Sequence, residues 1–100
     1  MALEIQENRG LFEISGRITS QNVGALKVYF DSIFETQDII VVSIEKVEEM
    51  DASAALFFEK LYKDVASQHK VLSIVGKQNK DIAAVMNATG TDYILSSDRI

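Results

Sequence analysis

The stretch IIVVSIEKVEEMDASAAL, residues 39–56, decides the fold. Its opening run over 39–44 is rich in β-branched residues and too short for a helix, which predicts a strand that is central in a sheet or covered on both faces. The acidic residues that follow predict a loop. Asp51 then has the chemistry of a helix N-cap, because its carboxylate can accept a backbone N–H bond from Ser53 or Ala54.

Two amphipathic helices flank this strand in the sequence. Thr19 and Ser20 are good N-cap residues, and the apolar residues after them recur at steps of three and four, which predicts a helix over about 20–36. A second apolar stripe predicts a helix over about 52–67. The side chains expected on its buried face are Ala54, Ala55, Phe58, Leu61, Tyr62 and Val65.

The rest of the chain supplies further strands and one short helix. The expected elements are strands over 2–7, 11–15, 71–75 and 93–95, a hairpin turn at 8–10, a short helix from Ile82 to near Gly90, and a loose tail over 96–100. The resulting order is β-β-α-β-α-β-α-β. It predicts a single α/β domain over 1–100, with a mixed sheet and helices packed on that sheet.

Composition and charge exclude several classes of protein. Fifteen acidic and ten basic residues give a net charge of −5, which repels phosphate backbones and argues against nucleic-acid binding. Cysteine is absent, which excludes disulfides and thiolate chemistry. No stretch approaches the ~18 apolar residues of a membrane span, and residues 1–10 hold no apolar run of the signal-peptide kind. We therefore expect a cytoplasmic protein without membrane insertion.

The residues that could carry catalysis are few. Glu45, Glu48, Glu49 and Asp51 could together hold Mg²⁺ or Ca²⁺, and a small enzyme using this acidic loop is one alternative, but no regular ligand spacing accompanies them. His69, the single histidine, falls in a polar turn and is expected to be solvated. The glycines are scattered and form no phosphate-binding loop. The sequence thus predicts no catalytic residue, no metal and no cofactor.

The turn Met50-Asp51-Ala52-Ser53, set between a buried strand and a helix, resembles the STAS family, the domain of bacterial anti-sigma factor antagonists. The resemblance covers nearly the whole chain and includes Gly16 at the end of the second strand. It implies a STAS-like fold and a non-enzymatic protein-interaction module in transcription regulation. In that family, a partner that is both anti-sigma factor and serine kinase phosphorylates the serine directly after the aspartate. The unphosphorylated domain binds this partner, and the phosphorylated domain releases it.

This sequence departs from the family pattern at the phosphorylation motif. Asp51 matches the family's aspartate, but Ala52 stands at the phosphoacceptor position and has no oxygen to phosphorylate. Ser53 matches the second hydroxyl residue, Ala54 replaces a glycine, and Thr19 stands where many members have an aspartate. We therefore expect the domain to resemble a permanently unphosphorylated member. Ser53 is either a substitute phosphoacceptor or a polar residue at the helix start.

The resemblance and the helical pattern together predict a partner-binding surface at the start of the second long helix. The predicted residues are Thr19, Asp51, Ala52, Ser53, Ala54, Leu56, Phe57 and Lys60. Leu56 points away from the expected core and Phe57 lies at its flank, so the two form either an apolar contact patch or ordinary isolated apolar exposure. The expected partner is an anti-sigma factor or a serine-kinase-like protein. The alternative is a constitutive small subunit of a stress-signalling assembly or a transporter, and the oligomeric state stays open.

Overall fold

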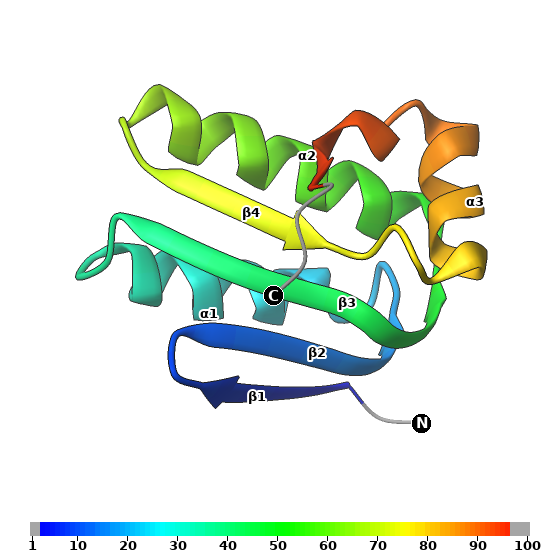
Figure 1. Ribbon diagram of the computed structural model, residues 1–100, viewed down its shortest axis with the longest axis horizontal. Helices are drawn as coiled ribbons and strands as arrows, with labels where there is room; N and C mark the ends of the chain where they lie inside the picture. The colour runs from blue at the N-terminus through cyan, green and yellow to red at the C-terminus, as the bar shows by residue number, and fades with distance from the viewer. Residues whose placement is uncertain (1–2, 97–100) are drawn as a thin grey trace.

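The computed structural model describes residues 3–96. Its elements, in chain order, are β1 (Glu4–Asn8), β2 (Leu11–Ile18), α1 (Val23–Phe34), β3 (Ile39–Met50), α2 (Ala52–Ser67), β4 (Val71–Val75), α3 (Lys80–Thr89), the 3-10 helix η1 (Asp92–Ile94) and β5 (Leu95–Ser96). The strands lie side by side in sequence order in one sheet (Figure 1). β1 and β2 are antiparallel and the other neighbouring pairs are parallel, so the predicted mixed α/β sheet is confirmed.

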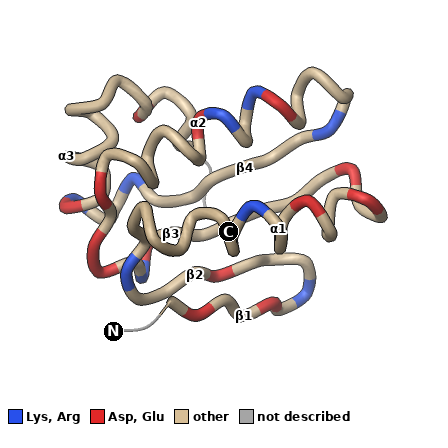
Figure 2. Tube along the Cα trace, turned by 180° about the vertical axis from the view of Figure 1, so that it is seen from behind, with Lys and Arg blue, Asp and Glu red and all other residues tan. Residues whose placement is uncertain are grey.

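The core lies between the sheet and the two long helices, which cover the same face of the sheet (Figures 1 and 2). Phe30 of α1 and Phe58 of α2 are fully buried, and the ring of Phe30 meets the ring of Phe12 edge-on with centroids 6.2 Å apart. Ala54 and Ala55 are also fully buried. Their small side chains place the first turns of α2 against the core, on the face that the sequence predicted to be buried.

The acidic segment after residue 44 is a strand and not the predicted loop, because β2 continues beyond residue 15 and offers it a pairing partner. Ile18 at the end of β2 pairs with Met50 at the end of β3. Val47 and Met50 face the core, at 4% exposure each. β3 contains two β-bulges relative to β2, where the alternation of apolar and polar side chains breaks, so the sequence pattern resembles a loop.

The first helix begins later than its predicted start near residue 20. Thr19 and Ser20 belong to a turn, and the N-cap position is occupied by Asn22. The Asn22 side chain turns back, so that its Oδ1 accepts the backbone N–H of Thr19 at 2.8 Å. The carbonyl of Thr19 accepts the N–H of Val23 at 3.2 Å. The N-cap prediction for Thr19 and Ser20 is therefore wrong.

The C-terminal elements follow the prediction with shifted boundaries. α3 ends at Gly90, whose φ of +74° is the left-handed conformation expected of a C-terminal glycine. Tyr93 lies in η1 and not in a strand, and the fifth strand is the short β5. Ser96 pairs with Val75 and is not part of a loose tail. Residues 97–100 of that predicted tail lie outside the described residues.

Candidate functional site

The side chain of Asp51 joins two turns of the chain at the N-terminus of α2. Its Oδ1 accepts the backbone N–H of Ala54 at 2.9 Å and caps the helix as expected, while its Oδ2 accepts the N–H of Ser20 at 3.0 Å. The N–H of Asp51 itself donates to the carbonyl of Ile18 at 3.2 Å. One carboxylate thus holds the turn between β2 and α1 against the start of α2.

Replacing Asp51 by alanine should lower the free energy of unfolding by about 2 kcal/mol, because both the cap and the link to Ser20 are lost. The measurement is a urea titration of the wild type and the variant. Asp51→Asn is the matched control: it keeps one acceptor oxygen for Ala54 and should lose about half as much. A loss below about 0.5 kcal/mol for Asp51→Ala would show that these bonds contribute little.

Four side chains on the first turns of α2 form one stripe, since they follow each other at i, i+3, i+4 and i+7. They are Ser53, Leu56, Phe57 and Lys60. Ser53 is exposed, Leu56 is 50% exposed, and Phe57 is partly buried with its ring edge-on to Phe58 at 5.2 Å. Lys60 is exposed and pairs with Asp64 at 2.9 Å. We name this stripe, with the exposed Ala52 before it and the adjacent Thr19, the α2 surface.

Two residues of the predicted partner-binding set have internal roles. Ala54 is fully buried against the sheet, so the expectation that it contacts a partner is wrong. Asp51 is partly buried, with both of its carboxylate oxygens accepting backbone N–H groups. Its carboxylate positions the α2 surface. Thr19 lies beside this surface because the next residue, Ser20, is bonded to Asp51.

The opposite flank of α2 makes contacts within the protein. Glu59 Oε2 accepts the hydroxyl of Tyr93 at 2.6 Å and lies 3.8 Å from the Nζ of Lys63. The hydrogen bond to Glu59 raises the pKa of Tyr93 above its ordinary value. This flank faces η1, so the more open flank of α2 is the one facing α1.

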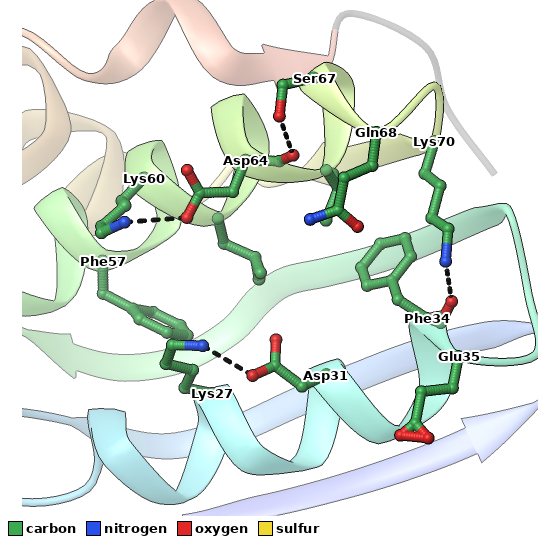
Figure 3. A pocket seen from close by; sticks show the side chains of 12 residues that line it. Lys27, Asp31, Phe34, Glu35, Phe57, Lys60, Asp64, Ser67, Gln68 and Lys70 are labelled. Atoms are coloured by element: carbon green, nitrogen blue, oxygen red, sulfur yellow. Dashed lines mark hydrogen bonds and ion pairs between the residues drawn. The ribbon is translucent and has the colours of Figure 1, made fainter.

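A groove of about 450 Å³ lies on that open flank, between α1 and α2 (Figure 3). Its lining residues are Lys27, Asp31, Phe34, Glu35, Phe57, Lys60, Leu61, Asp64, Val65, Ser67, Gln68 and Lys70. Lys70 closes one end by donating from Nζ to the carbonyl of Phe34. We name this feature the α1–α2 groove. Sequence reasoning missed it, although a lysine followed four residues later by an aspartate in both helices was a usable signal.

The acidic segment and the histidine do not form a reactive cluster. Glu45, Glu48 and Glu49 are exposed along β3, and Glu49 lies 3.9 Å from Arg17. Within residues 3–96, no three His, Asp or Glu side chains are placed to hold one metal ion. His69 is exposed in the turn after α2, with a φ of +64°. In the same described region, no helix has both the length and the apolar character needed to cross a membrane.

Comparison with known proteins places this architecture in one class. The sequence model of the STAS domain matches residues 1–98, and the chain therefore belongs to the STAS domain family. No curated protein matches the sequence. Among solved structures, unphosphorylated SpoIIAA, an anti-sigma factor antagonist, is similar with a TM-score of 0.73 and 14% identity, over 98% of this chain and 89% of that one. At this identity the likeness shows a shared fold.

A second solved structure is more distantly similar. It is an uncharacterized protein from Shewanella loihica with a SpoIIAA-like fold, at a TM-score of 0.52 and 18% identity. The match covers 76% of this chain and 66% of that chain. Both neighbours confirm the predicted STAS fold of mixed sheet and packed helices.

Proposed function

We propose that the protein is a non-enzymatic interaction module of the anti-sigma factor antagonist type, which binds a regulatory protein through the α2 surface. The observation that supports this proposal most strongly is the exposure of Leu56. Leu56 is an apolar side chain left 50% exposed beside Ala52 and Ser53, where the family resemblance places the partner. Removing such a side chain from water on binding is favourable, and a few apolar anchors of this kind dominate most interfaces. The expected partner is an ATP-binding anti-sigma factor or a related serine-kinase-like protein in the cytoplasm of a bacterium.

We further propose that the domain is not switched by phosphorylation at the usual position. Ala52 has no oxygen there, so no phosphate of about −1.5 to −2 charges can form beside the partner. The unmodified α2 surface then stays competent for binding. Ser53 is exposed in the first turn of α2, where a helix N-terminus accommodates an anion, and it is either a substitute acceptor or a polar residue at the helix start.

The alternative function is a constitutive small subunit of a stress-signalling assembly or a transporter. The missing hydroxyl at Ala52 favours this alternative, since a permanent contact needs no switch. The two functions differ in their response to kinase and ATP. Phosphate located on Ser53 by mass spectrometry would favour the switched module, whereas an unlabelled protein that stays bound to its partner would favour the permanent subunit.

The proposed function predicts that Leu56→Glu weakens partner binding by about 30-fold or more, because a carboxylate would be buried without a counter-charge. The measurement is calorimetric titration of the purified anti-sigma factors from the same genome. Val28→Glu is the matched control, since Val28 is also an apolar residue on a helix and is 72% exposed, but lies outside the α2 surface. Equal weakening by both variants would contradict the assigned surface, and wild-type protein that binds none of these factors would contradict the function.

A further inference from the structure

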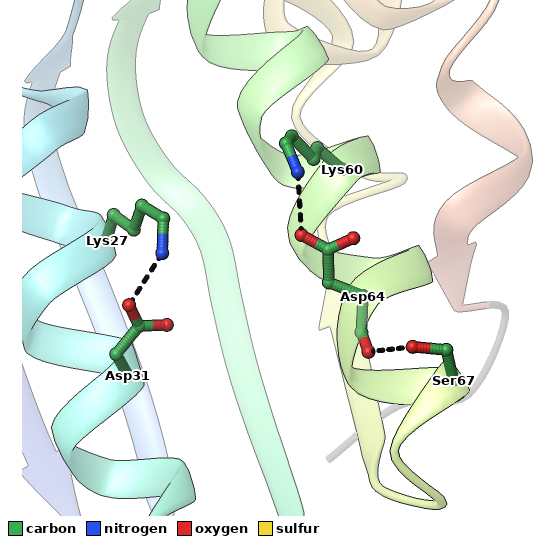
Figure 4. Close-up of polar contacts among 5 residues, drawn as sticks. All are labelled: Lys27, Asp31, Lys60, Asp64 and Ser67. Atoms are coloured by element: carbon green, nitrogen blue, oxygen red, sulfur yellow. Dashed lines mark hydrogen bonds and ion pairs between the residues drawn. The ribbon is translucent and has the colours of Figure 1, made fainter.

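The charges on the two rims of the α1–α2 groove follow the same order along its length. On α1, Lys27 pairs with Asp31 at 2.6 Å, and on α2, Lys60 pairs with Asp64 at 2.9 Å. In each helix the lysine comes first and the aspartate one turn later, and the two lysines lie at the same end of the groove (Figure 4). The hydrogen bond to Asp31 raises the pKa of Lys27, and the charge of Asp64 on the other helix adds to this effect. Lys27 and Lys60 thus make one end of the groove positive, Asp31 and Asp64 make its middle negative, and Lys70 lies at the other end.

This order is not explained by the stability of the helices themselves. An acidic residue placed four positions before a lysine stabilises a helix more than the reverse order does. Both rims have the reverse order, and all four side chains are more than half exposed. Exposed ion pairs of this kind contribute little to folding. The two ion pairs are therefore weak enough to be exchanged for ion pairs with a molecule that lies in the groove.

The floor between the rims is apolar. Phe34, Leu61 and Val65 line it, with the partly exposed ring of Phe57 at one end. From Phe57 to Gln68 the groove follows α2 for 11 positions, which is about 16 Å or three helical turns. An α-helix that presents apolar side chains at i, i+4 and i+7 has the length and period to cover such a floor.

We propose that the α1–α2 groove binds an amphipathic helix of the partner protein, with acidic side chains over Lys27 and Lys60 and basic side chains over Asp31 and Asp64. This inference rests on the proposed function, because Phe57 and Lys60 belong to both the groove and the α2 surface. Glu35 and Lys70 lie at the far end of the groove, where Lys70 donates to the carbonyl of Phe34 (Figure 3). A helix with acids near its N-terminus and bases near its C-terminus is also the order that its own dipole favours.

The test uses two synthetic 15-residue peptides with an alanine background, three leucines at i, i+4 and i+7, and blocked ends. One peptide carries Glu in its first half and Lys in its second half, and the other exchanges Glu with Lys. During titration, the amide chemical-shift changes of the ¹⁵N-labelled wild type should be concentrated at the groove residues. At low salt, the Glu-first peptide should bind about tenfold more tightly, as four surface ion pairs allow.

A charge-exchanged protein controls for any difference in helicity between the two peptides, because the peptides stay the same and only the rims change. In the variant Lys27→Glu, Asp31→Lys, Lys60→Glu and Asp64→Lys, both ion pairs remain possible but their order is reversed. This variant should prefer the Lys-first peptide. An unchanged preference would show that the peptides, and not the rims, determine the binding, and would overturn the proposal.

A second pair of variants tests the groove without altering its charges. Gln68→Trp places a bulky ring in the groove and should abolish peptide binding, whereas Ser32→Trp, on an exposed position of α1 outside the groove, should leave it intact. Absence of peptide binding to the wild type, or shifts centred elsewhere, would overturn the groove proposal. An anti-sigma factor that still binds the wild type and is lost with Leu56→Glu would leave the proposed function standing in that case.

Discussion

Gly76→Ala should lower the free energy of unfolding by about 3 kcal/mol or prevent folding altogether. A Cβ at this position would clash with Cγ1 of Ile44 and would lie 3.0 Å from its Cδ1. Ile44 is fully buried in β3, so its side chain has no free space to move into. The measurement is a urea titration followed by circular dichroism, with the midpoint and the slope recorded separately.

Two further variants separate this clash from a general effect of alanine. A Cβ added to Gly24 in α1 would have no heavy atom within 4 Å, so Gly24→Ala should be neutral or stabilise the protein by up to about 1 kcal/mol. Ile44→Ala removes both atoms that the new Cβ would meet. The double variant Gly76→Ala with Ile44→Ala should therefore lose less stability than the sum of the losses in these two single variants. Additive losses would contradict a direct contact between residues 76 and 44.

Asn79→Ala should lower the free energy of unfolding by about 2–4 kcal/mol, because this side chain serves two elements. Its Oδ1 caps α3 by accepting the N–H of Ile82 at 3.3 Å. Its Nδ2 donates to three β3 carbonyls, those of Ile44 at 3.3 Å, Glu45 at 3.1 Å and Val47 at 2.8 Å. These carbonyls lie around the bulges of β3, where ladder bonding is disrupted.

Asn79→Asp distinguishes the two roles. Aspartate keeps an acceptor for the cap on α3 but has no N–H to offer to β3, and its charge would repel the three carbonyl oxygens. We expect it to lose at least as much stability as Asn79→Ala. If the midpoint of urea unfolding of Asn79→Asp equals that of the wild type, the cap on α3 accounts for the contribution of Asn79 to stability and the link to β3 contributes nothing.

Local patterns of the sequence predicted the elements whose signals are local. The helix over 52–67 was predicted with its observed bounds, because Asp51 marks its start and an apolar stripe runs along its length. The same reasoning failed for the segment 45–49 of β3. There the partner strand and the bulges determine the structure, and the single-strand pattern does not contain them. Contacts between residues far apart in the chain were likewise out of reach, such as the link from Asn79 to Val47.

The candidate site could be predicted only in part for the same physical reason. The outward direction of Leu56 follows from helical periodicity alone, and the structure places that side chain half in solvent. The bond from Ser20 to Asp51 depends on how two turns meet, which no periodicity reveals. The α1–α2 groove depends on the spacing of two helices, so its rims were visible in the sequence only as two unrelated lysine–aspartate pairs.

The claim that this protein works by binding another protein at the start of α2 is tested most directly by hydrogen–deuterium exchange of the complex with the proposed anti-sigma factor partner. Slower exchange on complex formation should concentrate in residues 52–60 and in the turn at 19–20, while β1, at the far edge of the sheet, should exchange as in the free domain. Protection centred on β1 or on α3, with the start of α2 unchanged, would contradict the account.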